Sequence, residues 1–98
     1  MPDYLMLMHN DPSRAASDDA WGVYLHRLQH SGRFRGGSAI GAGVCRRKSG
    51  AAAPISAHLG GYIRLEANDL ADAETLIAGN PVFENGGTIE LRELPKSG

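Results

Sequence analysis

The segment from Thr88 to Leu94 alternates apolar and charged side chains, and this pattern constrains the fold more than any other. Successive side chains of a β-strand point to opposite faces, so strict alternation predicts a strand with one buried and one solvated face. Residues 61–67 alternate in the same way, with Ile63, Leu65 and Ala67 on one side. Both segments therefore predict strands of a sheet that is covered on one face and charged on the other.

A helix is predicted from Ser17 to Gly32. Ser17 is a favourable N-cap, the two aspartates that follow suit the first turn, and Gly32 supplies a C-terminal stop. Apolar side chains recur at the spacing of one helical face, and they are Trp21, Tyr24, Leu25 and Leu28. This spacing predicts a single buried stripe.

The remaining segments complete the order of elements. Residues 4–9 form a short apolar run that ends at turn-forming residues and predict a strand, and the glycine-rich residues 33–47 predict an irregular one. Residues 48–58 have no period and predict a loop. A second helix is expected from Asn68 or Asp69 to about Ala78, where Gly79-Asn80-Pro81 would end it.

The predicted order β-α-β-β-α-β is typical of the α+β, ferredoxin-like fold, a four-stranded antiparallel sheet with both helices on one face. The face toward the helices should carry Ile63, Leu65, Ile89 and Leu91. The uncovered face should carry Arg64, Glu66, Glu90 and Arg92, together with Met6, Met8 and Tyr62. A mixed apolar and charged face of this kind favours a partner, and we expect a second copy, packed sheet to sheet as a C2-symmetric dimeric α/β barrel.

Length and charge narrow the class of protein. The 98 residues predict one domain over residues 1–98, and the net charge of −1 offers no basic surface for nucleic acid. No apolar segment approaches the roughly 18 to 20 residues needed to span a bilayer, so no membrane association is expected. The single cysteine, Cys45, has no disulfide partner in the chain, and a cytoplasmic location is expected.

Residues 58–94, which read HLGGYIRLEANDLADAETLIAGNPVFENGGTIELREL, resemble the YCII-related proteins and their DGPF subgroup. The quoted features are a Leu-Gly-Gly-Tyr strand entry, a capped helix rich in Asp, Ala and Glu, an Asn-Pro near its end, and Gly-Gly-Thr-Ile-Glu-Leu-Arg. The first half agrees more loosely, through Trp21 and the Ser-Gly-Arg-Phe at residues 31–34. The resemblance implies a ferredoxin-like fold that dimerises into an α/β barrel, with a cleft between helices and sheet or at the dimer interface.

The chain departs from the family pattern at two places. Where the subgroup has Asp-Gly-Pro-Phe, this sequence has Ser49-Gly50-Ala51-Ala52. The resemblance also implies, for some members, a histidine early in the first helix that pairs with an aspartate, and that position is Trp21 here. The pair is therefore not transferred to this chain.

Candidate site residues come from the histidines and from the charged strand positions. His9 ends the first strand and His58 precedes Gly60-Gly61, so either is a candidate proton-transfer group or ligand anchor. His26 and His30 have a chelating spacing but no third ligand in the sequence, so no metal and no cofactor are expected. The candidate ligand-binding residues are Arg64, Glu66, Glu90, Arg92 and Phe83.

Two interpretations of the charged strand residues stay open. They form cross-strand salt bridges within or between subunits, or they line a polar pocket that binds an anionic group. The first functional hypothesis is accordingly a small homodimeric protein that binds a small organic ligand in a polar cleft. The alternative is a cofactor-independent enzyme, of a proton-transfer, isomerase, lyase or oxygenase-like type, that acts on a small aromatic or lactone-like substrate. A purely structural module is a third class.

Overall fold

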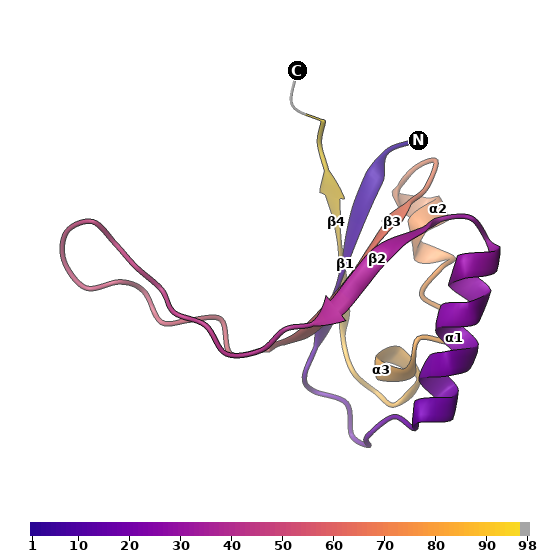
Figure 1. Ribbon diagram of the computed structural model, residues 1–98, viewed down its shortest axis with the longest axis horizontal. Coiled ribbons are helices and arrows are strands. Elements are labelled where there is room, and N and C mark those ends of the chain that lie inside the picture. The colour runs from indigo at the N-terminus through magenta and orange to yellow at the C-terminus, as the bar shows by residue number, and fades with distance from the viewer. Residues whose placement is uncertain (97–98) are drawn as a thin grey trace.

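The computed structural model describes residues 1–96, and Figure 1 shows an open sheet with its helices on one side. The four strands are antiparallel in the order β2-β3-β1-β4. This confirms the predicted α+β, ferredoxin-like arrangement. The elements are β1 (Asp3–His9), α1 (Asp18–His30), β2 (Phe34–Ala39), β3 (Leu59–Glu66), α2 (Leu70–Glu74), α3 (Pro81–Glu84) and β4 (Ile89–Leu94). Within residues 1–96, no helix combines the length and the apolar character that crossing a membrane requires.

The core lies between the sheet and α1. Its sheet side is formed by Ile63 and Leu65 of β3 and by alternate residues of β1, and its helix side by Tyr24 and Leu28. The prediction that Met6 and Met8 lie on the uncovered face is wrong, because both are buried in this core. Met6 pairs in register with Ile63 and with Leu91, and residues paired across antiparallel strands share a face.

Helix α1 begins where the sequence predicts. The side-chain oxygen of Ser17 accepts a hydrogen bond from the backbone N–H of Ala20 at 3.1 Å. Asp18 and Asp19 lie in the first turn, where the helix dipole stabilises negative charge. The chain leaves the helix through Gly32, whose φ of 74° is in the left-handed region that glycine adopts without strain.

The second predicted helix is shorter than expected. Helix α2 ends at Glu74, and the chain passes through turns to a separate one-turn helix, α3. Asn80 is completely buried and caps α3, because its side-chain oxygen accepts from the N–H groups of Val82 at 2.9 Å and Phe83 at 3.3 Å. The Asn-Pro pair therefore starts a helix as well as separating it from the preceding one, since proline is favoured at the first helical position.

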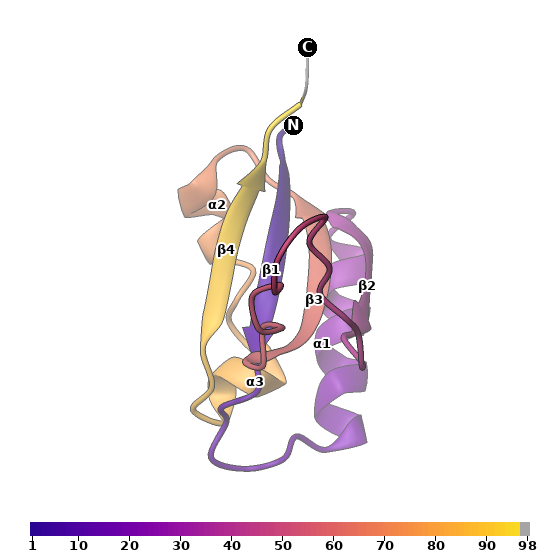
Figure 2. The same ribbon diagram turned by 90° about the vertical axis from the view of Figure 1, so that its left-hand side faces the viewer.

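Between β2 and β3 the chain forms an arm, residues 40–58, which projects from the side of the sheet opposite α1 (Figures 1 and 2). Strand β2 was predicted to extend to residue 47, but it ends at Ala39. The two limbs of the arm lie side by side near Gly43, where an added Cβ would lie 3.2 Å from Cδ1 of Ile55. Val44 is 75% exposed and Ile55 49% exposed, so the arm contributes little to the core.

The face of the sheet opposite the helices, here called the open face, is not covered by any helix of residues 1–96 (Figure 2). Leu5 and Leu7 of β1 lie at its centre and are half-buried. In register beside them lie side chains of both neighbouring strands, namely Tyr62, Arg64, Glu90 and Arg92.

Candidate functional site

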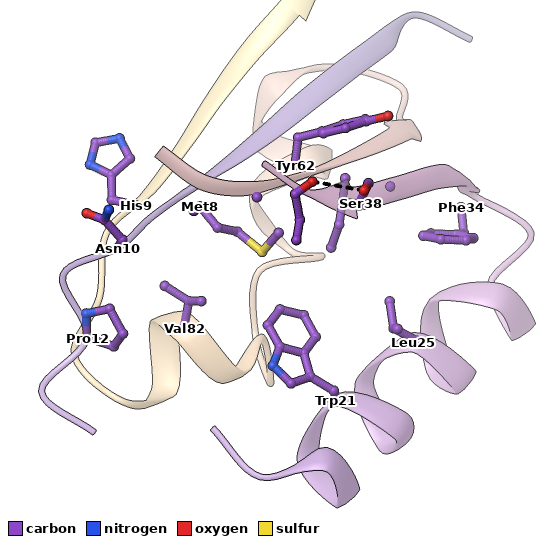
Figure 3. A pocket seen from close by; sticks show the side chains of 15 residues that line it. Met8, His9, Asn10, Pro12, Trp21, Leu25, Phe34, Ser38, Tyr62 and Val82 are labelled. Carbon is purple, nitrogen blue, oxygen red and sulfur yellow. Dashed lines mark hydrogen bonds between the residues drawn. The ribbon is translucent and has the colours of Figure 1, made fainter. Parts of the chain in front are cut away.

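A pocket of about 440 Å³ lies between α1 and the sheet (Figure 3). Trp21 and Leu25 of α1 form one wall, Phe34 of β2 closes one end, and Met8 and Val82 lie toward the other. The side chains that face the interior are thus predominantly apolar. Small organic molecules bind preferentially in concave, mostly apolar sites of this size.

The sheet forms the floor of the pocket, and the pocket exists because this part of the sheet lacks large side chains. Gly37 of β2 pairs with Ile63, and Ala39 of β2 pairs with Gly61, at positions that face α1. An added Cβ at Gly37 would lie 2.5 Å from the carbonyl oxygen of Tyr62, so β2 and β3 approach each other too closely for a larger residue. The glycines of β2 and β3 therefore leave the space beneath Trp21 unfilled.

The pocket has one potential hydrogen-bond donor on its helix wall. The indole nitrogen of Trp21 makes no hydrogen bond to residues 1–96, although the ring lines the pocket. A ligand that offers an acceptor could receive this N–H, while the two aromatic rings of Trp21 and Phe34 provide flat apolar surfaces. His9 and Asn10 lie at the edge, and the imidazole of His9 points away from the interior (Figure 3).

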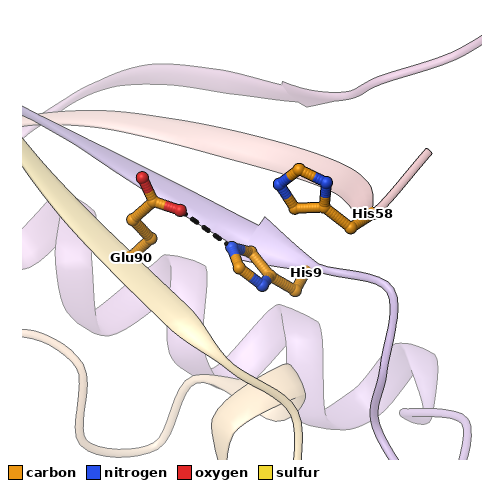
Figure 4. A group of neighbouring side chains, drawn as sticks. All are labelled: His9, His58 and Glu90. Atoms are coloured by element: carbon orange, nitrogen blue, oxygen red, sulfur yellow. Dashed lines mark hydrogen bonds and ion pairs between the residues drawn. The ribbon is translucent and has the colours of Figure 1, made fainter. Parts of the chain in front are cut away.

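A group of candidate side chains lies on the open face, where His9, His58 and Glu90 meet (Figure 4). Nε2 of His9 is 3.0 Å from Oε1 of Glu90. The imidazole rings of His9 and His58 are nearly perpendicular, with an interplanar angle of 76° and centroids 4.8 Å apart. One potential ligand atom from each residue lies within 4.8 Å of the others. We call these three residues the His-Glu cluster.

Backbone hydrogen bonds bring the His-Glu cluster together from three distant segments. The N–H of Asn10 donates to the carbonyl of His58 at 2.8 Å, and its side-chain amide donates to the carbonyl of Ala57 at 2.9 Å. The N–H of His9 donates to the carbonyl of Thr88 at 3.0 Å. The end of β1 is thus tied both to the base of the arm and to the start of β4.

The charge of Glu90 is stabilised within the cluster. The hydrogen bond from His9 is the main cause that lowers the pKa of Glu90, and a hydrogen bond from Arg92 to Oε2, 3.2 Å long, lowers the pKa further. Glu90 is consequently ionised at neutral pH. Its two oxygens have different partners, and only Oε1 faces His9.

The other charged residues proposed for ligand binding form ion pairs within the chain. Arg64 pairs with Asp3 at 3.2 Å, and Glu66 pairs with Arg35 at 3.1 Å. Each pair is partly exposed on the open face. Arg92 pairs with Glu90 along the same strand.

Phe83 lies on α3, on the helix side of the sheet, and is 48% exposed. It borders a second hollow with Ile77 and Leu91, separate from both the pocket and the open face. The structure therefore brings together His9, His58 and Glu90 among the candidate residues, whereas Phe83 lies apart from them.

Two residues that shape the pocket region were not identified as site residues from the sequence. Trp21 was assigned to the buried stripe of α1, but it is only half-buried and faces the pocket. Asn80 was assigned to a helix stop, but it is the buried cap of α3 and its amide nitrogen lies 3.5 Å from the sulfur of Met8. The signal available in the sequence was the Asn-Pro pair, because asparagine is a favoured N-cap and proline a favoured N1 residue.

Residues 3–96 match the family model of the YCII-related domain. The chain belongs to the YCII-related family. This confirms the resemblance to the YCII-related proteins over nearly the whole chain. No curated protein matches the chain.

In this YCII-related protein, the position early in α1 that the resemblance associates with a histidine is occupied by Trp21. The side chain at that position lines the pocket, so the pocket carries an indole there. An indole N–H donates a hydrogen bond but does not act as a base. The pocket of this member is therefore suited to binding through shape and apolar contact.

Proposed function

We propose that this YCII-related protein binds a small, largely apolar organic molecule in the pocket between α1 and the sheet, and that it does so as a homodimer. The pocket of about 440 Å³ that Trp21 and Phe34 flank is the observation that carries the proposal. A flat molecule of one or two rings fits an apolar space of this volume. An acceptor on its edge would receive the N–H of Trp21 and fix its orientation.

The homodimer is supported by the composition of the open face. Leu5 and Leu7 form an apolar centre, and charged residues of both signs, Arg64 and Glu90 among them, flank it. In a C2 dimer the same face of each copy meets the other, and a residue of one copy contacts a different residue of its partner. A face that carries both signs can therefore pair unlike charges across the interface. The arm projects on this same side, where it would contact a second copy packed on the open face (Figure 1).

The enzymatic alternative is favoured by a different observation, the 3.0 Å separation between Nε2 of His9 and Oε1 of Glu90. A carboxylate that orients an imidazole is a common arrangement for a general base. This pair lies on the open face, however, whereas the pocket lies on the helix side and the imidazole points away from it. Binding is therefore our first proposal, and proton transfer the second.

Trp21 is the single tryptophan of the chain, so its fluorescence reports on the pocket directly. The experiment is a titration of the protein with a panel of monocyclic and bicyclic aromatic compounds. We expect a saturable change in emission for at least one compound. The substitution Leu25→Asp places a carboxylate in the apolar wall and should abolish the change.

The matched control is Val23→Asp, which adds the same charge to α1 at a residue that is 70% exposed. This variant should bind as the original protein does. Binding that is equal in Leu25→Asp and Val23→Asp, or no response to any compound in the panel, would refute the pocket as a ligand site.

A further inference from the structure

We propose that the His-Glu cluster is a binding site for a divalent transition-metal ion of the zinc class. Its three residues, His9, His58 and Glu90, are the one group of three potential metal ligands that the structure contains within residues 1–96. Two imidazoles and one carboxylate form a donor set that zinc accepts. The proposal concerns the open face and is independent of the pocket and its ligand.

The distances suit a shared ion. Two ligand atoms that are each about 2.0 to 2.1 Å from a tetrahedral zinc ion lie about 3.3 Å apart. Nε2 of His9 and Oε1 of Glu90 are 3.0 Å apart, so an ion can sit between them after a small widening. His58 is exposed, and its side chain has room to turn until its nitrogen closes the remaining distance.

The surroundings hold the ligands in place. Arg92 donates to Oε2 of Glu90 and leaves Oε1 for the ion, and an outer hydrogen bond of this type orients a metal-binding carboxylate. The two hydrogen bonds of Asn10 fix the backbone of His58 beside the end of β1. The positive charge of Arg92 opposes a cation, but the ionised Glu90 lies between them.

Binding requires a change of tautomer. Nε2 of His9 faces a carboxylate oxygen of Glu90, and a neutral imidazole donates this hydrogen bond when its proton is on Nε2. For the ion to take the place of the hydrogen bond, the proton moves to Nδ1 through solvent, and the lone pair of Nε2 then coordinates the metal. Three protein ligands would leave at least one coordination position for water.

The chain contains its own control in α1. His26 and His30 are one helical turn apart, and their ring centroids are separated by 4.7 Å, close to the 4.8 Å between His9 and His58. They form no group of three with a carboxylate or thiol among residues 1–96. Two imidazoles without a third ligand should bind zinc more weakly than the His-Glu cluster.

The test is calorimetric titration of the untagged, EDTA-treated and dialysed protein with ZnCl2. We expect one ion per chain. The substitutions His58→Ala and Glu90→Gln should each weaken binding by at least about tenfold, the lower end of the loss caused by altering even an outer-shell partner. The double substitution His26→Ala with His30→Ala should leave the affinity of this site unchanged.

A second measurement distinguishes coordination from loose association. Titration with CoCl2 should produce the visible absorption bands of a low-coordinate cobalt site, and Glu90→Gln should remove them. Circular dichroism spectra that match the original protein would show that the variants are folded. An absence of saturable zinc binding, one ion per two chains, or loss of binding in the His26 and His30 double variant instead of in His58→Ala would overturn the proposal.

Discussion

Tyr24 of α1 donates a hydrogen bond from its hydroxyl to the carbonyl oxygen of Leu76, 2.7 Å away, in the segment that follows α2. Tyr24 is 1% exposed, and burial raises the pKa of its phenol. The hydroxyl therefore keeps its proton at neutral pH. This bond joins the first helix to the turns after α2, as does the hydrogen bond from Arg27 to the carbonyl of Ala78. It is therefore expected to stabilise the region that presents Asn80 and α3.

The substitution Tyr24→Phe should lower the free energy of unfolding by about 1 kcal/mol, because it leaves the partly buried carbonyl of Leu76 without its donor. Urea unfolding followed by circular dichroism measures the difference. Tyr62→Phe is the matched control, since the hydroxyl of Tyr62 makes no hydrogen bond to residues 1–96 and its ring lies on the open face. An equal loss in both variants would contradict the role assigned to Tyr24.

The substitution Gly37→Ala should destabilise the protein by more than about 1 kcal/mol, the lower end of the cost of overpacking. The added Cβ would lie 2.5 Å from the backbone oxygen of Tyr62, and the backbone cannot move without separating β2 from β3. The thermal unfolding midpoint measures this effect.

Gly22→Ala is the control, and its expected change in stability is opposite to that of Gly37→Ala. Gly22 lies inside α1, and an added Cβ there has no heavy atom within 4 Å. Since alanine favours a helix over glycine by about 1 kcal/mol, this variant should be more stable than the original protein. A gain in stability for Gly37→Ala would show that the close approach of β2 and β3 is relaxed in solution.

Acid should destabilise the protein partly through Asp72. A hydrogen bond from the N–H of Asn68, 2.8 Å long, is the main cause that lowers the pKa of Asp72, and the ion pair with Arg33 lowers the pKa further. A pKa that is lower in the folded than in the unfolded state contributes stability above the unfolded value, near pH 4. This contribution is lost as the pH falls through the folded value.

We therefore expect Asp72→Asn to be less stable than the original protein at pH 6 and to lose less stability between pH 5 and pH 3. The measurement is the urea midpoint at a series of pH values. Glu74→Gln, a change at an exposed carboxylate of the same helix, should keep the pH dependence of the original protein. Parallel pH profiles for Asp72→Asn and the original protein would exclude the proposed linkage.

The proposed homodimer predicts that Leu7→Asp weakens self-association. Leu7 lies at the centre of the open face, and a carboxylate buried there in both copies should raise the dimer dissociation constant at least about tenfold. Size-exclusion chromatography with light scattering over a range of concentrations measures the shift. Val23→Asp, on the far side of α1, should not change the mass, and a monomeric original protein would refute the dimer.

The sequence predicted the elements well where a local signal was strong. Ser17 caps α1 as expected, and the alternation in β3 and β4 correctly assigned Ile63 and Leu65 to the covered face. The orientation of β1 was wrong because its two faces are both apolar: Leu5 and Leu7 alternate with Met6 and Met8. Only the pairing with β3 and β4 decides which set is buried.

The sites were harder to predict, for two physical reasons. The pocket arises from side chains that are missing, at Gly37 and Gly61, and it becomes visible only when β2 and β3 are paired beneath Trp21. The His-Glu cluster joins residues 9, 58 and 90, and the contact depends on hydrogen bonds of Asn10 that the sequence does not reveal. All three residues were candidates, but their contact with one another was not predicted.

The arm also bears on how the chain folds. Strands β2 and β3 are antiparallel neighbours that a connection of two to five residues could join, yet residues 40–58 separate them. Closing this longer loop costs roughly 1 kcal/mol more than closing a short one. Within residues 1–96, β2 pairs with β3 alone, so β2 can dock only after the two ends of the arm have met. An isolated chain would therefore fold more readily with the arm shortened.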